Sequence, residues 1–480
     1  MSDSLVRSLE AILSPGQVLC NERARMDAYT VDVWLMARRD LYPPRVRPVA
    51  VLPDDTAEVA RVMRWCHDAG VPVRIRGAGA GDTGGALPRR DGEVIVDTRR
   101  LRTRALAERD QVATVGVGWI LLTVEEWLRR RAYTLGHLPA SISCSSVGGF
   151  LANAGSGILS TRYGKLAENV VSLVVVLPDG EVLRTPRVRA HAMGPDLNSL
   201  FLGSEGIYGV VTEADLRLHR LTPLRLMALS FPSFGAGIAW GRRVTQLGLA
   251  PALIRLYDEE ESRGLVAEGS DCIAVVGVDG VEAIARAEVA CLRDEAQAAG
   301  ARLLPDAVAS DWYGRRMAPY FPPNSMESRD VLHGVVDFVA RYTDIEACLA
   351  AVREELAGSY PELHVSAHCS HWLSYGTMAY LSFWSPVLPR GQALWTAYYS
   401  ILERIFAGIR RHGALMNEHH GVGVKLRPFF ARQYEESGVV TVLERLKQAL
   451  DPRGLINAGN ILEPGAAPPG AAEEARDDAG

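Results

Sequence analysis

Three glycine-rich clusters constrain this chain more than any other feature of its sequence. The chain has 480 residues, of which 45 are glycine. The clusters lie at 79–92, 139–164 and 203–213, each beside an apolar segment typical of a β-strand. Glycine lets the backbone adopt positive φ angles and approach a ligand closely. The clusters therefore predict one long polar ligand held between three backbone loops.

The first cluster contains Gly-Ala-Gly-Asp-Thr-Gly over 79–84, directly after a strand predicted over 71–76. This spacing matches a dinucleotide-binding motif, which requires that the last glycine open a helix. Gly85, Pro88 and Gly92 follow instead, and they are incompatible with an ordinary helix. The alternatives are a plain flexible turn or a loop whose N–H groups face an anion, and the sequence favours the loop.

Composition narrows the class of protein. The net charge of −5 argues against a nucleic-acid binder, which would be basic. No apolar run is long enough for a membrane span, and the N-terminus lacks the features of a secretion signal. We therefore expect a cytoplasmic enzyme, and peripheral attachment to a membrane stays open. The seven scattered cysteines form no Cys-x-x-Cys pair, which favours reduced buried thiols over disulfides or zinc.

Apolar periodicity predicts two α/β units. In the first, a helix runs from an N-cap at Asp55 to Gly70, with Val59, Val62, Met63 and Cys66 on its apolar face. Further elements are expected as strands over 94–97, 112–117 and 173–177, a helix over 120–131 and a hairpin at 178–183. From about residue 221, strands near 224–231 and 272–277 alternate with helices near 234–248, 281–300, 344–357 and 391–412. This rhythm indicates a second α+β domain.

Adjacent histidines form the main candidate for chemistry. His419 and His420 follow Glu418 and precede Gly-Val-Gly, so their imidazoles could act as general acids and bases or bind an anion. Metal binding by Glu418 and these histidines together with His368 and His371 is an alternative, as is a set of ordinary hydrogen-bonded loop residues. We assign no metal site.

A strand predicted over 376–383 carries the second candidate. Strand alternation places Met378, Tyr380 and Ser382 on one face and the intervening residues on the other. Tyr380 could donate or accept a proton, or it could be a core aromatic residue whose hydroxyl is satisfied.

The glycine clusters carry a resemblance to a known family. Residues 45–220 resemble the FAD-binding domain of the vanillyl-alcohol oxidase/p-cresol methylhydroxylase superfamily in RPVAVLPDDTAEVARVMRWCHDAGVPVRIRGAGAGDTGGA, SSVGGFLANAGSGILSTRYGKLAENVVSLVVVLPDGEVL and LFLGSEGIYGVVTEADLRL. The end, LKQALDPRGLINAGNIL, is similar to the family's C-terminal signature. The resemblance implies an α+β fold, with a two-subdomain FAD-binding domain of the p-cresol methylhydroxylase (PCMH) type and an α/β cap domain containing an antiparallel sheet. We expect an N-terminal helical segment over 1–44, the FAD domain over 45–222, the cap over 223–412, a returning segment over 413–464 and a disordered tail over 465–480.

The resemblance implies FAD as the cofactor and assigns residues to it. The first loop would hold the pyrophosphate through Arg76, Gly77, Ala78, Gly79, Ala80, Gly81 and Asp82. The second cluster would line the flavin and ribityl chain through Ser141, Ser146, Gly148, Gly149, Ser156 and Gly157, and Pro139 and Asn153 belong to the same cofactor-binding set. Glu205, Gly206 and Val211 would lie at the adenine end, and Asn457 would approach the isoalloxazine. Relatives with covalent flavin often have a histidine at the position of Ala80, so we expect non-covalent FAD. A link through Cys144 is the alternative, and a buried thiol is favoured there.

The histidine and tyrosine segments resemble one branch, the alkyldihydroxyacetonephosphate synthases and their bacterial relatives. Those proteins have two or three histidines before Gly-Val-Gly and a Ser-His segment leading to Tyr-x-x-Phe, whereas the glycolate oxidase and D-lactate dehydrogenase branch has Glu-His-Gly. The resemblance implies catalytic candidates at Tyr380, His371, His419 and His420 and an anion-binding role for Arg255. Glu418 replaces a further histidine, and the segment at 318–324 lacks an expected arginine, so the substrate is predicted to be less anionic.

Two reactions remain open at this point. The first is oxidation of a small hydroxy acid or alcohol, in which His420 or Tyr380 takes the hydroxyl proton, hydride passes to flavin N5, and Arg255 or Lys425 orients a carboxylate. The alternative is the redox-neutral synthase reaction, which exchanges an acyl group for an alkyl ether and needs an apolar tunnel. The candidates for its lining, or for ordinary core, are Trp312, Tyr313, Met317, Tyr320 and Phe321. A flavin-binding protein without catalysis is a third, weaker hypothesis. The partner is a small-molecule substrate, the electron acceptor could be oxygen, a quinone or a cytochrome, and a homodimer is expected by analogy.

Overall fold

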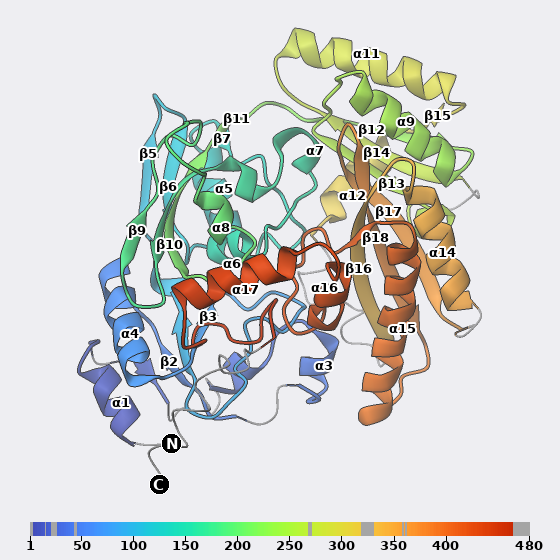
Figure 1. Cartoon of the computed structure of the whole chain (residues 1–480). Coiled ribbons are helices and arrows are strands. Elements are labelled where there is room, and N and C mark those ends of the chain that lie inside the picture. The colour runs from blue at the N-terminus through green and yellow to red at the C-terminus, as the bar shows by residue number, and fades with distance from the viewer. Residues whose placement is uncertain are drawn as a thin grey trace.

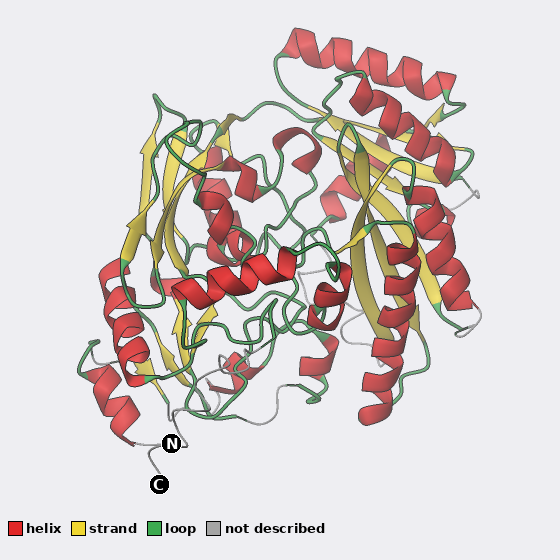
Figure 2. Ribbon diagram, viewed as in Figure 1, coloured by secondary structure: helices red, strands yellow, loops and turns green. Residues whose placement is uncertain are grey.

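The structure, a computed structural model, describes residues 3–463 except 15, 21–25, 43–45, 267–270, 318–330, 358–359 and 361. Two sheets and their helices form one part of the molecule, and a larger sheet with four long helices forms the other (Figures 1 and 2). This is the predicted fold class. The tail expected over 465–480 and the segment at 318–324 lie outside the described residues.

The first sheet has the order β1-β2-β4-β3. Its strands are β1 (Val18–Leu19), β2 (Val49–Val51), β3 (Val73–Arg76) and β4 (Val94–Asp97). β2 and β3 pair with β4 in parallel, so helix α4 (Thr56–Ala69) crosses from β2 to β3. Asp55 accepts the Glu58 N–H at the start of α4, and Gly70 ends the helix with a φ of 68°. The predicted apolar face of α4 is buried, as expected.

The second sheet is antiparallel, with the order β5-β6-β10-β8-β9. Its strands are β5 (Arg104–Ala107), β6 (Val112–Gly116), β8 (Val170–Val176), β9 (Val182–Arg184) and β10 (Val210–Arg217). The accompanying elements are α5 (Leu121–Arg129), α6 (Val147–Ala152), α7 (Ser160–Tyr163), α8 (Asn198–Phe201) and the small pair β7 (Tyr133–Thr134) and β11 (His219–Arg220). The second glycine cluster enters α6, which Ser146 caps by accepting the Gly149 N–H.

The third sheet has eight strands in the order β15-β12-β14-β13-β17-β18-β16-β19, and all its pairs are antiparallel. Its strands are β12 (Arg225–Phe231), β13 (Leu253–Tyr257), β14 (Cys272–Val278), β15 (Arg302–Leu303), β16 (Leu332–Arg341), β17 (His364–Trp372), β18 (Gly376–Ser385) and β19 (Leu415–Met416). One face packs on the helices α9 (Phe234–Gln246), α11 (Glu282–Ala298), α14 (Ile345–Ala357) and α15 (Gln392–Arg411).

Strand alternation separates the two faces of this sheet. On β18, Ala379, Leu381 and Phe383 join the core beneath the helices. Met378, Tyr380 and Ser382 point the other way, into a cavity shared with the first part of the molecule. The alternation predicted for this strand is therefore confirmed, and it directs one row of side chains to the cavity.

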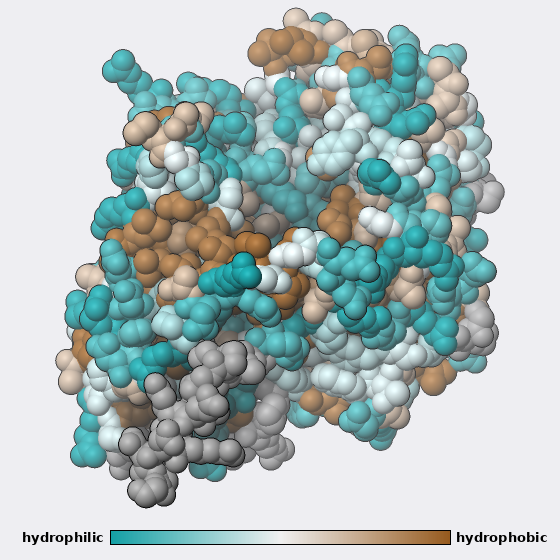
Figure 3. Space-filling model, in the orientation of Figure 1, coloured by the Kyte–Doolittle hydropathy of each residue, from teal (hydrophilic) through white to brown (hydrophobic). Residues whose placement is uncertain are grey.

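The remaining described elements are short or peripheral. They are α1 (Asp3–Glu10), α3 (Leu35–Arg38), α10 (Glu259–Ser262), α12 (Asp306–Arg315), α16 (Arg427–Gln433), α17 (Val439–Leu450) and the 3₁₀ turns Ala28–Thr30, Thr98–Arg100 and Leu166–Asn169. Apolar side chains gather beside α17 on the face shown in Figure 3, where Val442 is 55% exposed. No helix in the described part of the chain is long and apolar enough to cross a membrane.

The C-terminal segment returns to the first sheet. Arg74 on β3 pairs with Glu93 at 2.8 Å, and both side chains are at most 1% exposed. Arg74 Nη1 also donates to Asn460 Oδ1 at 3.0 Å, and Ile75 N donates to Asn457 Oδ1 at 2.8 Å. These bonds tie residues 457–460 to the sheet that precedes the first glycine loop.

Replacing Arg74 by Met tests this connection. The change leaves the Glu93 carboxylate buried without its partner, so we expect a loss of about 3–5 kcal/mol in unfolding free energy. Arg432→Met is the matched control, because its partner Glu403 and Arg432 itself are 47% and 45% exposed, and there the loss should stay below about 1 kcal/mol. Denaturant unfolding measures both. Equal small losses would show that the Arg74–Glu93 pair contributes no more to stability than an exposed ion pair.

Candidate active site

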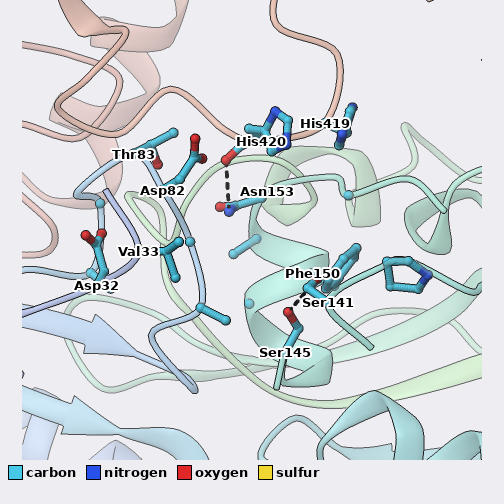
Figure 4. Close-up of a pocket in the computed structure, with 18 of the residues that line it drawn as sticks. Asp32, Val33, Asp82, Thr83, Ser141, Ser145, Phe150, Asn153, His419 and His420 are labelled. Carbon is cyan, nitrogen blue, oxygen red and sulfur yellow. Dashed lines mark hydrogen bonds between the residues drawn. The ribbon is translucent and has the colours of Figure 1, made fainter. Parts of the chain in front are cut away.

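A cavity of about 520 Å³ lies between the glycine loops and the third sheet. All three clusters contribute to its wall, together with β13, β17, β18 and the loop over 417–426 that carries His419 and His420 (the histidine loop). Figure 4 shows part of this wall. The predicted residues in the wall are Gly77, Ala78, Gly79, Ala80, Gly81, Asp82, Pro139, Ser141, Ser146, Gly148, Gly149, Asn153, Ser156, Gly157, Glu205, Gly206, Val211, Arg255, Tyr380, His419, His420 and Asn457. Arg76 and His371 lie behind it.

The first glycine loop packs against Ser146. A Cβ on Gly77 would lie 2.3 Å from Ser146 Oγ, and that hydroxyl accepts a hydrogen bond from Ala78 N. Arg76 donates to the carbonyls of Ala28 and Val31, so it anchors the N-terminal segment. A Cβ on Gly81 would meet no atom within 4 Å. The loop therefore presents its backbone to the cavity.

Glu205 joins the third cluster to the histidine loop. Its buried carboxylate accepts the N–H groups of Val422 and Gly423, and its carbonyl accepts Asn457 Nδ2 at 2.6 Å. Burial raises the pKa of Glu205 above its usual value, against these backbone hydrogen bonds. The carboxylate that the resemblance assigns to the adenine end is thus occupied with protein N–H groups.

Asp337 organises the histidine loop from below. It lies on β16 opposite Tyr380 of β18, and its side chain is 1% exposed. Its two oxygens accept the backbone N–H of His419 at 3.0 Å, His419 Nδ1 at 3.1 Å and His420 Nδ1. Asn153 Nδ2 fixes the same loop from the second cluster by donating to the His420 carbonyl at 3.2 Å (Figure 4).

Glu418 continues this network behind the cavity. Its Oε1 lies 2.7 Å from both His371 Nδ1 and Lys165 Nζ, and its Oε2 lies 2.9 Å from His419 Nδ1. Ser156 of the second cluster donates to Oε2 at 3.0 Å. His371 is outside the cavity wall and contacts Glu418, which in turn contacts His419 of the wall.

The carboxylate of Asp337 and the imidazole of His419 shift each other's pKa. Burial opposes ionisation of Asp337, but His419 and His420 hold its pKa well below the usual value. Burial also opposes the charged form of His419, but Asp337 and Glu418 raise its pKa to about 10. His419 is therefore an imidazolium at neutral pH.

Tyr380 lies between two imidazoles. The ring of His368 stacks on it with centroids 4.7 Å apart, and the ring of His419 lies 5.9 Å away with an interplanar angle of 24°. Arg255 Nη2 lies 2.7 Å from His368 Nε2. Arginine can only donate, so His368 accepts at Nε2 and carries its proton on Nδ1, 3.1 Å from Glu261 Oε2. Burial and Arg255 lower the pKa of His368 to about 4.

Lys425 is engaged elsewhere. Its buried ammonium donates to Asp82 Oδ2 at 2.8 Å and to the Val335 carbonyl at 3.0 Å. Burial disfavours the charged form, but Asp82 more than offsets this and raises the pKa of Lys425. Lys425 lies outside the cavity wall and positions Asp82, which leaves Arg255 as the better candidate for orienting a carboxylate.

Asp337, His419 and His420 have ligand atoms within 4.8 Å of one another, a set different from the one considered from the sequence. Both Nδ1 atoms face carboxylate oxygens to which they donate. Hydrogen bonding thus explains the cluster, and we assign no metal to it.

Two carboxylates of the site escaped the sequence analysis. Asp337 is the one charged residue in the apolar stretch Val335–Val339, a signal that could have been found. Glu261 is one of three consecutive glutamates, and nothing in the sequence distinguishes it. Of the tunnel candidates, Trp312 is 7% exposed in the core, and Tyr313 lines a separate cavity of about 430 Å³. Tyr320 and Phe321 lie outside the described residues.

A two-part fold with three glycine loops, facing an antiparallel sheet that carries tyrosine and histidines, defines a flavin-dependent enzyme class. Residues 48–186 match the family model described as an FAD binding domain, and residues 222–461 match that of the FAD linked oxidases, C-terminal domain. The chain belongs to the FAD linked oxidases, within the vanillyl-alcohol oxidase/p-cresol methylhydroxylase superfamily, and FAD is its cofactor.

Its relatives have several activities. The chain is 27% identical to an alkyldihydroxyacetonephosphate synthase of Trypanosoma brucei brucei, over 93% of this chain and 79% of that protein. It is 26% identical to a mitochondrial D-lactate dehydrogenase (cytochrome) of Arabidopsis thaliana, over 87% of this chain and 73% of that protein. A solved alkyldihydroxyacetonephosphate synthase has a TM-score of 0.78 at 22% identity, and the match covers 95% of this chain and 84% of that chain. p-Cresol methylhydroxylase with substrate bound has a TM-score of 0.77 at 15% identity, covering 96% of each chain. The structural likenesses concern the fold.

Gly81→Val tests the cofactor cradle. The added Cβ would meet no protein atom within 4 Å and would project from a residue of the cavity wall, so FAD affinity should fall about tenfold or more while the stability of the FAD-free protein changes little. Gly314→Val is the control, because its Cβ also meets nothing within 4 Å and it lies outside the cavity. FAD titration and thermal unfolding give both quantities. Normal FAD affinity in Gly81→Val would contradict this placement.

Proposed function

We propose that this protein is an FAD-dependent oxidoreductase that oxidises a small hydroxy acid or alcohol by hydride transfer to flavin N5. The observation that carries the proposal is the placement of His419, His420 and Tyr380 in one cavity wall, opposite the three glycine loops. The similarity to a D-lactate dehydrogenase supports the reaction class. The glycine loops hold the cofactor non-covalently, with Ala80 where a linking histidine would stand.

Each residue has a defined task in this proposal. Bound FAD supplies a two-electron acceptor. His420 donates its Nδ1–H to Asp337, so Nε2 is its acceptor for the substrate hydroxyl proton. The His419 imidazolium offsets the negative charge of Asp337 and Glu418 and stabilises an alkoxide forming beside it. Tyr380 positions the reacting carbon between these groups, and Arg255 receives a carboxylate.

The redox-neutral alternative has one specific observation in its favour. Tyr380, His419 and His420 share the cavity wall in the pattern of the synthase branch, and two such synthases are among the chain's relatives. Glu418 weighs against it, because a carboxylate paired with His371 and Lys165 stands where the synthases often have a further histidine.

An anaerobic visible spectrum of the FAD-loaded protein separates the two reactions. We expect the flavin bands to bleach on addition of one member of a panel of 2-hydroxy acids and alcohols. Bands that survive the whole panel, together with turnover of an acylated ketone phosphate and a fatty alcohol, would contradict oxidation and establish the exchange reaction.

Asp337→Asn tests the catalytic assignment. The amide cannot orient both Nδ1–H groups, so we expect the rate of anaerobic flavin reduction to fall about 100-fold or more. The pKa of His419, raised to about 10 by Asp337 and Glu418, should also fall, because an anionic partner is lost. The loss of rate should therefore deepen with rising pH, as His419 gives up its proton earlier than in the parent protein. Stopped-flow reduction from pH 6 to 10 measures both effects.

Asp344→Asn is the matched control for that experiment. Asp344 pairs with Arg341 at the far end of β16 and lies outside the cavity wall, so its rate and pH profile should equal those of the parent. If Asp337→Asn matched the parent as well, Asp337 would have no part in orienting the histidines.

A further inference from the structure

Glu261 is a carboxylate in the cavity wall that the proposed reaction does not use. It lies on α10, and it is separated from Arg255 by one imidazole ring, that of His368. Burial raises its pKa, but the charge interaction and the hydrogen bond with His368, followed by the charge of Arg255, bring the pKa below the usual value. A substrate anion that approaches Arg255 therefore meets an ionised carboxylate in the same wall.

We infer that Glu261 is a specificity-determining residue that admits substrates with at most one negative charge at Arg255 and rejects phosphate monoester dianions. This inference rests on the proposed function in one respect, the use of Arg255 as the anchor for the substrate's anionic group. It adds a substrate class: neutral alcohols or monocarboxylates rather than phosphorylated compounds.

The carboxylate cannot easily turn away from the site. Asp258, which is fully buried, accepts the Glu261 N–H at 2.9 Å. The same Asp258 side chain accepts the Ala367 N–H of β17 at 2.6 Å and pairs with Arg353 at 2.8 Å. The first turn of α10 is thus fixed to the strand that carries His368, and Glu261 stays beside that ring.

His368 joins the two charges without adding one. Its Nε2 accepts from Arg255 and its Nδ1–H donates to Glu261, so a second proton would break the contact with Arg255. Arg255 and Glu261 therefore sum to zero net charge across a neutral bridge. A monoanion can share Arg255 with this bridge, whereas a dianion brings a second charge that Glu261 repels.

The rest of the described wall offers no surplus positive charge to a dianion. Lys425 is paired with Asp82, and it is buried behind that residue. The His419 imidazolium lies between Asp337 and Glu418, and Lys165 is paired with Glu418. At a separation of about 8–10 Å and an effective dielectric constant of about 20, one extra charge facing Glu261 weakens binding by roughly tenfold or more.

The test compares two ketone probes, pyruvate as a monoanion and dihydroxyacetone phosphate as a dianion at pH 8. Both are titrated into the oxidised, FAD-loaded protein, and binding is followed by perturbation of the flavin spectrum and by calorimetry. We expect pyruvate to bind more tightly to the parent protein. Glu261→Gln should shift the ratio of the two dissociation constants by about tenfold toward dihydroxyacetone phosphate.

Glu260→Gln is the matched control, because Glu260 is 43% exposed and pairs with Arg263 outside the cavity. The ratio of the two dissociation constants in Glu260→Gln should equal that of the parent protein. Tighter binding of dihydroxyacetone phosphate than of pyruvate by the parent protein would overturn the inference, without need of any variant. An unchanged ratio in FAD-loaded Glu261→Gln would overturn it too.

A third variant, at Arg255, distinguishes failure of the Glu261 inference from failure of the proposed function. If Arg255→Met binds both probes as tightly as the parent, the anchor itself is misassigned, and the inference falls with it. The oxidation reaction is judged separately by anaerobic bleaching, since equilibrium binding of these ketones needs no turnover.

Discussion

The active-site architecture depends on one buried carboxylate. Asp337 lies in the middle of a strand of the third sheet, with its side chain 1% exposed, and such a charge is stable only when hydrogen bonds replace its lost hydration. The partners come from residues 418–420, which supply two backbone N–H groups and two imidazoles. The loop is bent to deliver them, with Asn417 at a φ of 76° and donating its N–H to the Asp337 carbonyl. The hydrogen bonds that stabilise the buried Asp337 carboxylate thus fix the orientation of both histidines.

The same loop connects the two parts of the molecule. Val422 and Gly423 donate to Glu205 of the third glycine cluster, and Asn153 of the second donates to His420. Thr83 of the first loop accepts the N–H groups of Val424 and Lys425. Because these contacts fix the histidine loop relative to the glycine loops, a change at Asp337 is expected to alter the placement of both histidines in the cavity wall and the charge of His419.

Local sequence patterns were sufficient for most of the fold. The helix ending at Gly70, the strand at 94–97 and the long helix near 391–412 have the expected places, because caps and apolar periodicity mark them. The alternation around Tyr380 also gave the correct cavity face. Asp337 and Glu261 were missed because their roles come from tertiary contacts: the β16–β18 register sets Asp337 beside Tyr380, and the turn of α10 sets Glu261 beside His368. Arg76 and His371 were expected to line the cavity, but they lie behind its wall. Local sequence patterns do not determine how far a side chain lies from the surface of a cavity.

The charge of His419, which Asp337 and Glu418 favour, and the tautomers of His420 and His368 can be measured directly. Nitrogen NMR of the FAD-loaded protein labelled with ¹⁵N-histidine reports the protons on each ring nitrogen. We expect His419 to carry protons on both nitrogens at pH 8, the Nδ1 of His420 to be protonated and hydrogen-bonded, and His368 to be a neutral Nδ1–H tautomer. A neutral His419 at pH 8, or Nε2–H tautomers at His368 and His420, would contradict this arrangement of the site.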